Sequence, residues 1–171
     1  KGKTIFVADT SVHEYPSSEQ MSEIAISSAR VVRLFGFDPK VAFVSHSTFG
    51  QPVTSRTKHI KKAVDILKEK NVDFEFDGDM QPDVALNKEY KNLYPFSNIV
   101  GNANILIMPG QHSAAISYKM MKELGDTKVI GPLLIGLGLP IEIAPLRTST
   151  SELINLASIA AYSADVIDYK K

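Results

Sequence analysis

The chain has 171 residues and a mass of 18.8 kDa, enough for one α/β domain or one domain with a docking segment. Its 19 basic and 19 acidic residues cancel, which argues against nucleic acid as a partner because nucleic-acid-binding proteins usually carry a basic excess. The absence of cysteine excludes disulfides, thiolate nucleophiles and cysteine-based metal sites, and it fits a cytoplasmic location. No apolar run approaches the ~20 residues that span a bilayer, so we expect neither membrane association nor a signal peptide.

Four apolar runs rich in β-branched residues predict strands that are buried in a sheet. They occupy residues 3–8, 40–45, 72–76 and 103–108. The turn residues Asp77 and Gly78 are expected to end the third strand. Weaker β-like runs follow later in the chain, at residues 128–130, 133–137 and 139–143.

Segments with an apolar period of about 3.6 residues alternate with these strands and predict helices. They occupy residues 17–35, 57–70, 82–90, 113–124 and 149–169. The first helix is expected to begin at a capping box formed by Ser17 and Gln20 and to end at Gly36. This alternation indicates an α/β fold with a mostly parallel sheet that helices cover on both faces.

Ligands of such sheets lie beyond the carboxyl ends of the strands, so the loops there are the candidate sites. In the loop from Ser45 to Thr48, hydroxyls and backbone N–H groups come together and could cradle a phosphate. Arg56 opens a basic helix directly after this loop, and such a helix would attract a ligand with several phosphates. The same residues also fit a polar turn that caps a solvated helix, and the residues alone leave both interpretations open.

The histidines and loop carboxylates form no recognisable metal motif. The four histidines are well separated and lack the HExxH spacing, so we expect no metal site. The loop carboxylates could act as a general base or orient a substrate amide, and they serve equally well in turns and helix caps. These carboxylates are Asp9, Asp77, Asp79 and Asp83.

Five segments, in the right order, resemble the phosphate acetyl/butyryltransferase (phosphotransacetylase) family over nearly the whole chain. They are FVADTSV from Phe6, VAFVSHST from Val41, FDGDMQ from Phe76, ANILIMP from Ala103 and IGPLLIG from Ile130. The chain is most similar to the C-terminal domain of bacterial NADP-dependent malic enzymes, in the segments FVAD, SHS and DMQ. The resemblance implies the second α/β subdomain of the family fold at residues 1–143. Residues 144–171 would form a C-terminal helical segment that returns to a missing first subdomain.

The chain departs from the family where active enzymes hold their substrate. The family's Ser-Arg pair before the last helix falls on Pro145 and Leu146, or on Arg147 with a slip of one residue. A second family arginine falls at about Glu123, which reverses the charge. Acyl-phosphate chemistry needs such arginines to neutralise negative charge, so we expect no catalytic residue in this chain.

The resemblance therefore implies a regulatory and oligomerisation domain of an NADP-dependent malic enzyme that senses acetyl-CoA or a related CoA ester. Oxidative decarboxylation of malate to pyruvate, NADP and a divalent metal would belong to an upstream catalytic domain, and this chain would hold no cofactor. We expect a homodimer or a higher homo-oligomer. Two alternatives remain, an active phosphate acetyltransferase fragment that moves acyl groups between CoA and phosphate, and a ligand-free structural dimerisation domain. The expected effector-binding residues are Ser45, Ser47, Thr48, Arg56, Asp77, Gln81, Arg147 and Glu152.

Overall fold

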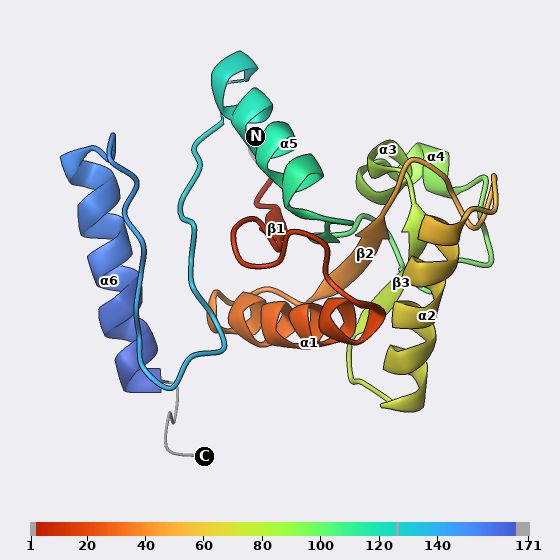
Figure 1. Cartoon of the computed structure of the whole chain (residues 1–171), viewed down its shortest axis with the longest axis horizontal. Coiled ribbons are helices and arrows are strands. Elements are labelled where there is room, and N and C mark those ends of the chain that lie inside the picture. The colour runs from red at the N-terminus through yellow and green to blue at the C-terminus, as the bar shows by residue number, and fades with distance from the viewer. Residues whose placement is uncertain (1–2, 126, 167–171) are drawn as a thin grey trace. The chain divides into compact units, whose positions relative to one another are not determined.

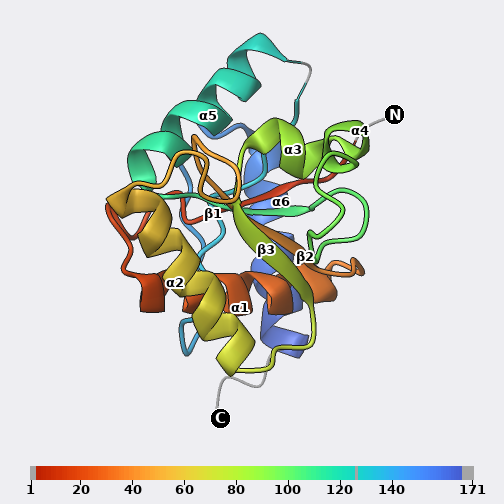
Figure 2. The ribbon, with the colours of Figure 1, turned by 90° about the vertical axis from the view of Figure 1, so that its right-hand side faces the viewer.

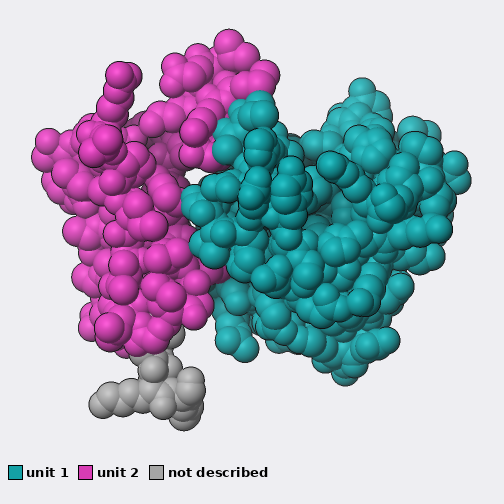
Figure 3. Space-filling model, viewed as in Figure 1, with its two compact units in different colours: residues 1–117 teal, residues 118–171 magenta. Residues whose placement is uncertain are grey.

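A computed structural model describes residues 3–125 and 127–166 of the chain. The chain forms two compact units, residues 1–117 and residues 118–171, which Figure 3 shows in separate colours. The boundary that the resemblance places at residue 143 concerns subdomains of the family fold, and it stays a prediction.

The first unit is built around a sheet of four parallel strands in the order β1–β4–β2–β3 (Figure 1). Its central strands β2 and β4 are apolar along their whole lengths apart from Lys40, as expected for a sheet that is covered on both faces. The parallel α/β fold predicted from the sequence is thereby confirmed. The strands are β1 (Phe6–Ala8), β2 (Lys40–Val44), β3 (Glu75–Met80) and β4 (Ile105–Ile107).

Helices cover both faces of this sheet. Helices α1 (Ser18–Leu34) and α2 (Ser55–Glu69) lie side by side on one face (Figure 2), where Phe43 of β2 is fully buried among their apolar side chains. The opposite face buries Val44 of β2 under α3 (Pro82–Leu86) and the first turn of α5 (Gln111–Leu124). Successive residues of β2 thus point into two different cores, as the pleat of a strand requires.

Helices α1 and α2 each begin at a capping box of two side chains. The predicted capping box of Ser17 and Gln20 is present at the start of α1, and Gly36 follows the helix with a φ of +80°. A second capping box, formed by Thr54 and Thr57, starts α2 two residues before the predicted position. The apolar face predicted for this helix is buried as expected.

The third strand lies later in the chain than the sequence predicts. It runs from Glu75 to Met80 instead of 72–76, because its neighbour β2 begins at Lys40, which pairs with Glu75. Val72 and Phe74 therefore have no strand beside them, although both pack against the core under α2. A parallel strand forms only where its partner continues, and the apolar alternation does not contain that information.

Asp77 and Gly78 do not end this strand, in contrast to the prediction. They lie in the middle of β3, opposite the place where the register with β2 shifts after Phe43. Gly78 has a φ of +155°, and a Cβ at this position would lie 2.7 Å from the Cβ of Phe43. The glycine is therefore needed for close approach within the sheet rather than for a turn.

The single helix predicted at residues 82–90 is divided in two, α3 and α4 (Lys88–Lys91). Asn87 separates them, because its backbone is extended and its Oδ1 accepts the N–H of Glu89 at 3.0 Å. Asparagine side chains compete in this way with the helical hydrogen bonds of the backbone.

The second unit contains the end of α5, a long connection and α6 (Thr150–Val166). The three β-like runs predicted between residues 128 and 143 do not form strands in the described part of this connection, where only Leu133 and Glu142 make an isolated bridge. Glycines and prolines interrupt these runs, and proline lacks the N–H that a ladder requires. Ile167 and the predicted helix end at residue 169 lie outside the described residues. No helix within the described ranges has the length and apolarity needed to cross a membrane.

Candidate functional site

Two of the predicted strand-end loops meet at the carboxyl end of the sheet. The backbone N–H of Ser45 donates to the carbonyl of Met80 at 2.9 Å, and the side-chain amide of Gln81 donates to the carbonyl of His46 at 2.9 Å. The backbone N–H of Gln81 donates to the hydroxyl of Thr48 at 3.1 Å. We call residues 45–51 and 79–81 together the loop pair, since these hydrogen bonds join them into one structure.

Asp79 is the centre of the loop pair. Its buried carboxylate accepts hydrogen bonds from the hydroxyl of Ser47 and, at 3.0 Å, from the backbone N–H of Gly50. Its backbone carbonyl accepts the N–H of Phe49 at 2.6 Å. The sequence predicted a general base, a substrate contact or a turn for Asp79, and so missed this role in holding the loop after β2 against the end of β3. No local pattern in the sequence reveals this role, because the two partners of the carboxylate lie 32 and 29 residues away in the chain.

Three of the predicted effector-binding residues turn out to hold the structure together. Ser47 and Thr48 are buried, and their hydroxyls are used by Asp79 and Gln81. The buried Asp77 accepts the N–H of its neighbour Gly78 at 2.9 Å and that of Asn98 at 2.7 Å, which attaches the segment before β4 to the edge of β3.

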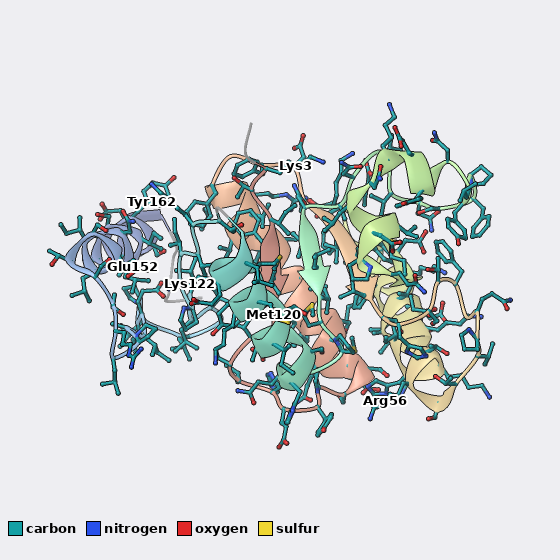
Figure 4. All side chains as sticks on the ribbon, turned by 90° about the horizontal axis from the view of Figure 1, so that it is seen from above. Lys3, Arg56, Met120, Lys122, Glu152 and Tyr162 are labelled. Atoms are coloured by element: carbon teal, nitrogen blue, oxygen red, sulfur yellow. The ribbon has the colours of Figure 1, made fainter. Side chains whose placement is uncertain are left out.

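Ser45, Arg56 and Gln81 are the predicted residues of this region that reach solvent. Arg56 is exposed in the first turn of α2 (Figure 4), and it forms no salt bridge with any residue that the structure describes. The basic surface of α2 is smaller than the sequence indicates, because Lys62 pairs with Glu19 of α1 at 2.6 Å. Lys58 and Lys61 of α2 also stay exposed, and Arg56 is the cation of this helix that follows the loop most closely in the sequence.

The loop after β1 is ordered by a carboxylate. Asp9 accepts the backbone N–H groups of Ser11, Val12 and His13, and its Oδ2 lies 2.8 Å from Nδ1 of His13. Burial raises the pKa of Asp9, but these hydrogen bonds outweigh it and leave the pKa below its ordinary value. Within residues 3–125 and 127–166, no three acidic or histidine side chains converge as a metal site would require.

Arg147 and Glu152 belong to the second unit. The carboxylate of Glu152 accepts the backbone N–H and the hydroxyl of Ser149, both at 2.7 Å, and so caps the start of α6. The bond from the N–H of Ser149 contributes most to lowering the pKa of Glu152, and Lys122 adds to it from 3.6 Å (Figure 4). Arg147 is exposed in the connection before this helix.

Comparisons with known proteins agree with this fold. A family model described as phosphate acetyl/butaryl transferase matches residues 1–161. An NADP-dependent malic enzyme from Rhizobium meliloti is 48% identical over 96% of this chain, which spans 22% of that enzyme. A phosphate acetyltransferase from Clostridium acetobutylicum is 34% identical over 94% of this chain, which spans 49% of it. The solved EutD phosphotransacetylase from Staphylococcus aureus matches with a TM-score of 0.88 at 29% identity, over 96% of this chain and 52% of that one.

The family model, the sequence relatives and the solved structure therefore each match nearly the whole chain. The chain spans about a fifth of the malic enzyme and about half of the phosphate acetyltransferase that it matches, and it resembles the phosphotransacetylase-like region of malic enzymes. It belongs to the phosphate acetyl/butaryl transferase family.

Proposed function

We propose that this chain is a non-catalytic regulatory and oligomerisation domain of an NADP-dependent malic enzyme and that it responds to acetyl-CoA or a related CoA ester. The observation that carries the proposal is the 48% identity to a malic enzyme, compared with 34% to a phosphate acetyltransferase, over almost the same part of the chain. Malate oxidation, with its NADP and divalent metal, would then take place in a catalytic domain upstream of this chain, in the cytoplasm.

The absence of catalysis in this domain is supported by the residues at the family's substrate-binding positions. Pro145 and Glu123 stand where the resemblance expects a serine and an arginine, so the hydroxyl and one positive charge are missing. Leu146 at the neighbouring position is fully exposed and offers no hydrogen-bond donor from its side chain. Transfer of an acyl group to phosphate requires donors that stabilise the developing negative charge.

The loop pair and the first turn of α2 supply chemistry that suits the phosphates of a CoA ester. Ser45 offers a hydroxyl, Gln81 an amide and Arg56 a guanidinium, and all three reach solvent at the carboxyl end of the sheet. Arg56 also lies in the first turn of α2, where the helix dipole favours negative charge. Asp79, Ser47 and Thr48 would support this site by fixing the loop rather than by contacting the ligand.

Substitution of Arg56 tests this proposal. In the full-length enzyme, Arg56→Ala should raise the acetyl-CoA concentration for half-maximal effect roughly tenfold, because a charge-assisted hydrogen bond contributes about 1.5–3 kcal/mol and ~1.4 kcal/mol is tenfold. Malate oxidation without acetyl-CoA should keep its rate. Arg30→Ala, which removes an exposed arginine of α1, is the matched control. Full acetyl-CoA sensitivity in Arg56→Ala would contradict the assignment of the site.

An active phosphate acetyltransferase is the second candidate, and the TM-score of 0.88 to a phosphotransacetylase favours it. A coupled assay of acetyl phosphate formation from acetyl-CoA and phosphate distinguishes the two functions. A turnover of ~1–1000 per second, the usual range of enzymes, would replace the regulatory proposal by this one.

A further inference from the structure

Three aromatic side chains gather beside the loop pair. Phe49 belongs to the loop after β2, whereas Tyr94 and Phe96 come from the segment between α4 and β4. The ring centroids of Phe49 and Phe96 are 4.8 Å apart in an edge-to-face arrangement, and that of Tyr94 lies 5.5 Å from Phe49 and 6.1 Å from Phe96. We call these three residues the aromatic cluster.

One ring of the aromatic cluster, Phe96, is exposed, whereas Phe49 and Tyr94 are half-buried behind it and pack against the core that contains Val44 and Val84. Phe96 is 65% exposed, and Val53, which lies against Gly50 of the same loop, is 63% exposed. By contrast, Phe43 of the neighbouring strand is fully buried. An exposed aromatic ring that rests on half-buried ones offers a flat apolar surface to a ligand, while its exposed face brings no stability to the isolated domain.

The backbone holds the cluster in a fixed position. Phe49 has a φ of +49°, a left-handed conformation that is uncommon for residues other than glycine. Asp79 stabilises it, because its carbonyl accepts the N–H of Phe49 and its carboxylate accepts the N–H of Gly50. The same carboxylate also binds the hydroxyl of Ser47, so the aromatic ring and the hydroxyl-rich loop are positioned by one buried group. Residues in such conformations concentrate at ligand sites, where the surrounding structure determines them.

We infer that the aromatic cluster is a stacking platform for the adenine base of the CoA ester, with Phe96 as its most exposed ring. The inference rests on the proposed function and adds to it the recognition of the nucleotide half of the ligand. A purine is planar and aromatic, and it stacks on rings of this kind without needing hydrogen bonds to its edges. Ser45, in the same loop as Phe49, and Arg56, in the first turn of α2, supply the hydroxyl and the charge that the phosphates of the ligand require.

The experiment measures the binding of the nucleotide half and of the acetyl-pantetheine half of the ligand separately. Acetyl-CoA, adenosine 3′,5′-bisphosphate and acetyl-pantetheine are titrated by calorimetry into the full-length protein and into its Phe96→Ala and Phe96→Leu variants. Phe96→Ala should lower the affinity for acetyl-CoA and for the nucleotide by about fivefold or more, which is within the range of one stacked base. The affinity for acetyl-pantetheine should stay unchanged. Phe96→Leu should lose part of this affinity, since it keeps apolar area but not the aromatic face. The matched control is Phe37→Ala, which removes a 41% exposed ring that contacts Phe6 beyond the end of α1.

The possible failures are distinct. Equal nucleotide affinity in the unaltered protein and in Phe96→Ala would overturn the stacking platform and leave the proposed function intact; an exposed patch that serves a protein partner would give this result. No binding of acetyl-CoA to the unaltered protein would overturn the proposed function together with this inference. Far-ultraviolet circular dichroism confirms that each variant keeps its fold, which the exposure of Phe96 leads us to expect.

Discussion

Asp79 shows how one buried carboxylate can organise a loop at the end of a sheet through hydrogen bonds within the protein. It satisfies a hydroxyl and a backbone N–H of the loop after β2 and thereby holds that loop against β3. A buried carboxylate is costly unless it is hydrogen-bonded, so this arrangement is stable only while Ser47 and Gly50 stay in place. The position of the loop therefore depends on Asp79 of β3 together with Ser47 and Gly50 of the loop itself.

The neighbouring Gly78 offers a prediction on stability. Gly78→Ala should lower the free energy of unfolding by about 1–3 kcal/mol, because the new methyl group meets the backbone of β2 and the φ is unfavourable. A Cβ at residue 78 would lie 2.7 Å from the Cβ and 2.8 Å from the carbonyl oxygen of Phe43. Urea denaturation followed by circular dichroism measures the change.

Gly36→Ala is the control for this experiment. Gly36 has a φ of +80°, and a Cβ added to it would meet no neighbouring atom within 4 Å, so it reports the cost of the backbone conformation alone. We expect a smaller loss there, about 1 kcal/mol. Equal losses in the two variants would show that close packing against Phe43 does not restrict residue 78.

The separation along the sequence between two interacting residues explains which residue roles the sequence could predict. The capping box of Ser17 and Gln20 joins residues three apart, so its pattern is visible in the chain. The hydrogen bonds of Asp79 reach residues 32 and 29 positions away, and no local pattern contains such pairs. For the same reason the sequence marked Ser47 and Thr48 as ligand-binding hydroxyls, although folding engages them within the loop pair.

At the scale of elements, ion pairs join helices α1 and α2 along their exposed edge. Glu19 pairs with Lys62 at 2.6 Å, and Glu23 pairs with Lys70. Lys62 lowers the pKa of Glu19 from its ordinary value of 4.5 to about 2, chiefly through a hydrogen bond. These pairs use two lysines of the basic segment for which the sequence left a ligand and a solvated helix face both open, and they link α1 to α2.

The pKa of Glu19 predicts how stability depends on pH. A carboxyl group whose pKa is lower in the folded protein stabilises it fully above the ordinary value of 4.5, and this contribution is lost as the pH falls toward about 2. The free energy of unfolding should therefore fall more steeply between these pH values in the unaltered protein than in Glu19→Gln. Urea denaturation at a series of pH values measures both slopes. Glu69→Gln, at an exposed position of α2, should behave like the unaltered protein, and parallel curves for Glu19→Gln would refute the coupling.

Element boundaries were predictable where they depend on local chemistry and not where they depend on a neighbour. Helix α1 begins and ends at its own caps, as predicted. The start of β3 instead depends on its pairing with Lys40 of β2. The division at Asn87 is an exception, because it rests on a local cap of α4 that the continuous apolar pattern concealed. The β-like runs after residue 127 have the composition of strands, but the described connection provides them with no continuous partner.

At the scale of the whole molecule, α5 carries an apolar face that this chain leaves exposed. Ile116, Met120 and Leu124 are four residues apart, so they share one side of the helix, and they are 58%, 54% and 83% exposed. Helix α6 adds exposed apolar side chains, among them Ile154 and Tyr162. Since exposed apolar surface of this kind usually marks an interface, we propose that a second copy of the chain covers the α5 face.

Light scattering of the chain at micromolar concentration should accordingly give a mass of a dimer or larger instead of 18.8 kDa. Leu124→Glu should shift the mass toward the monomer, because association would bury a carboxylate without a partner. Leu93→Glu, which changes a 71% exposed leucine of the first unit, should leave the mass unchanged and shows that added charge alone is not the cause. A monomeric mass for the unaltered chain would contradict self-association through α5, and the apolar face would then require a partner from outside this chain.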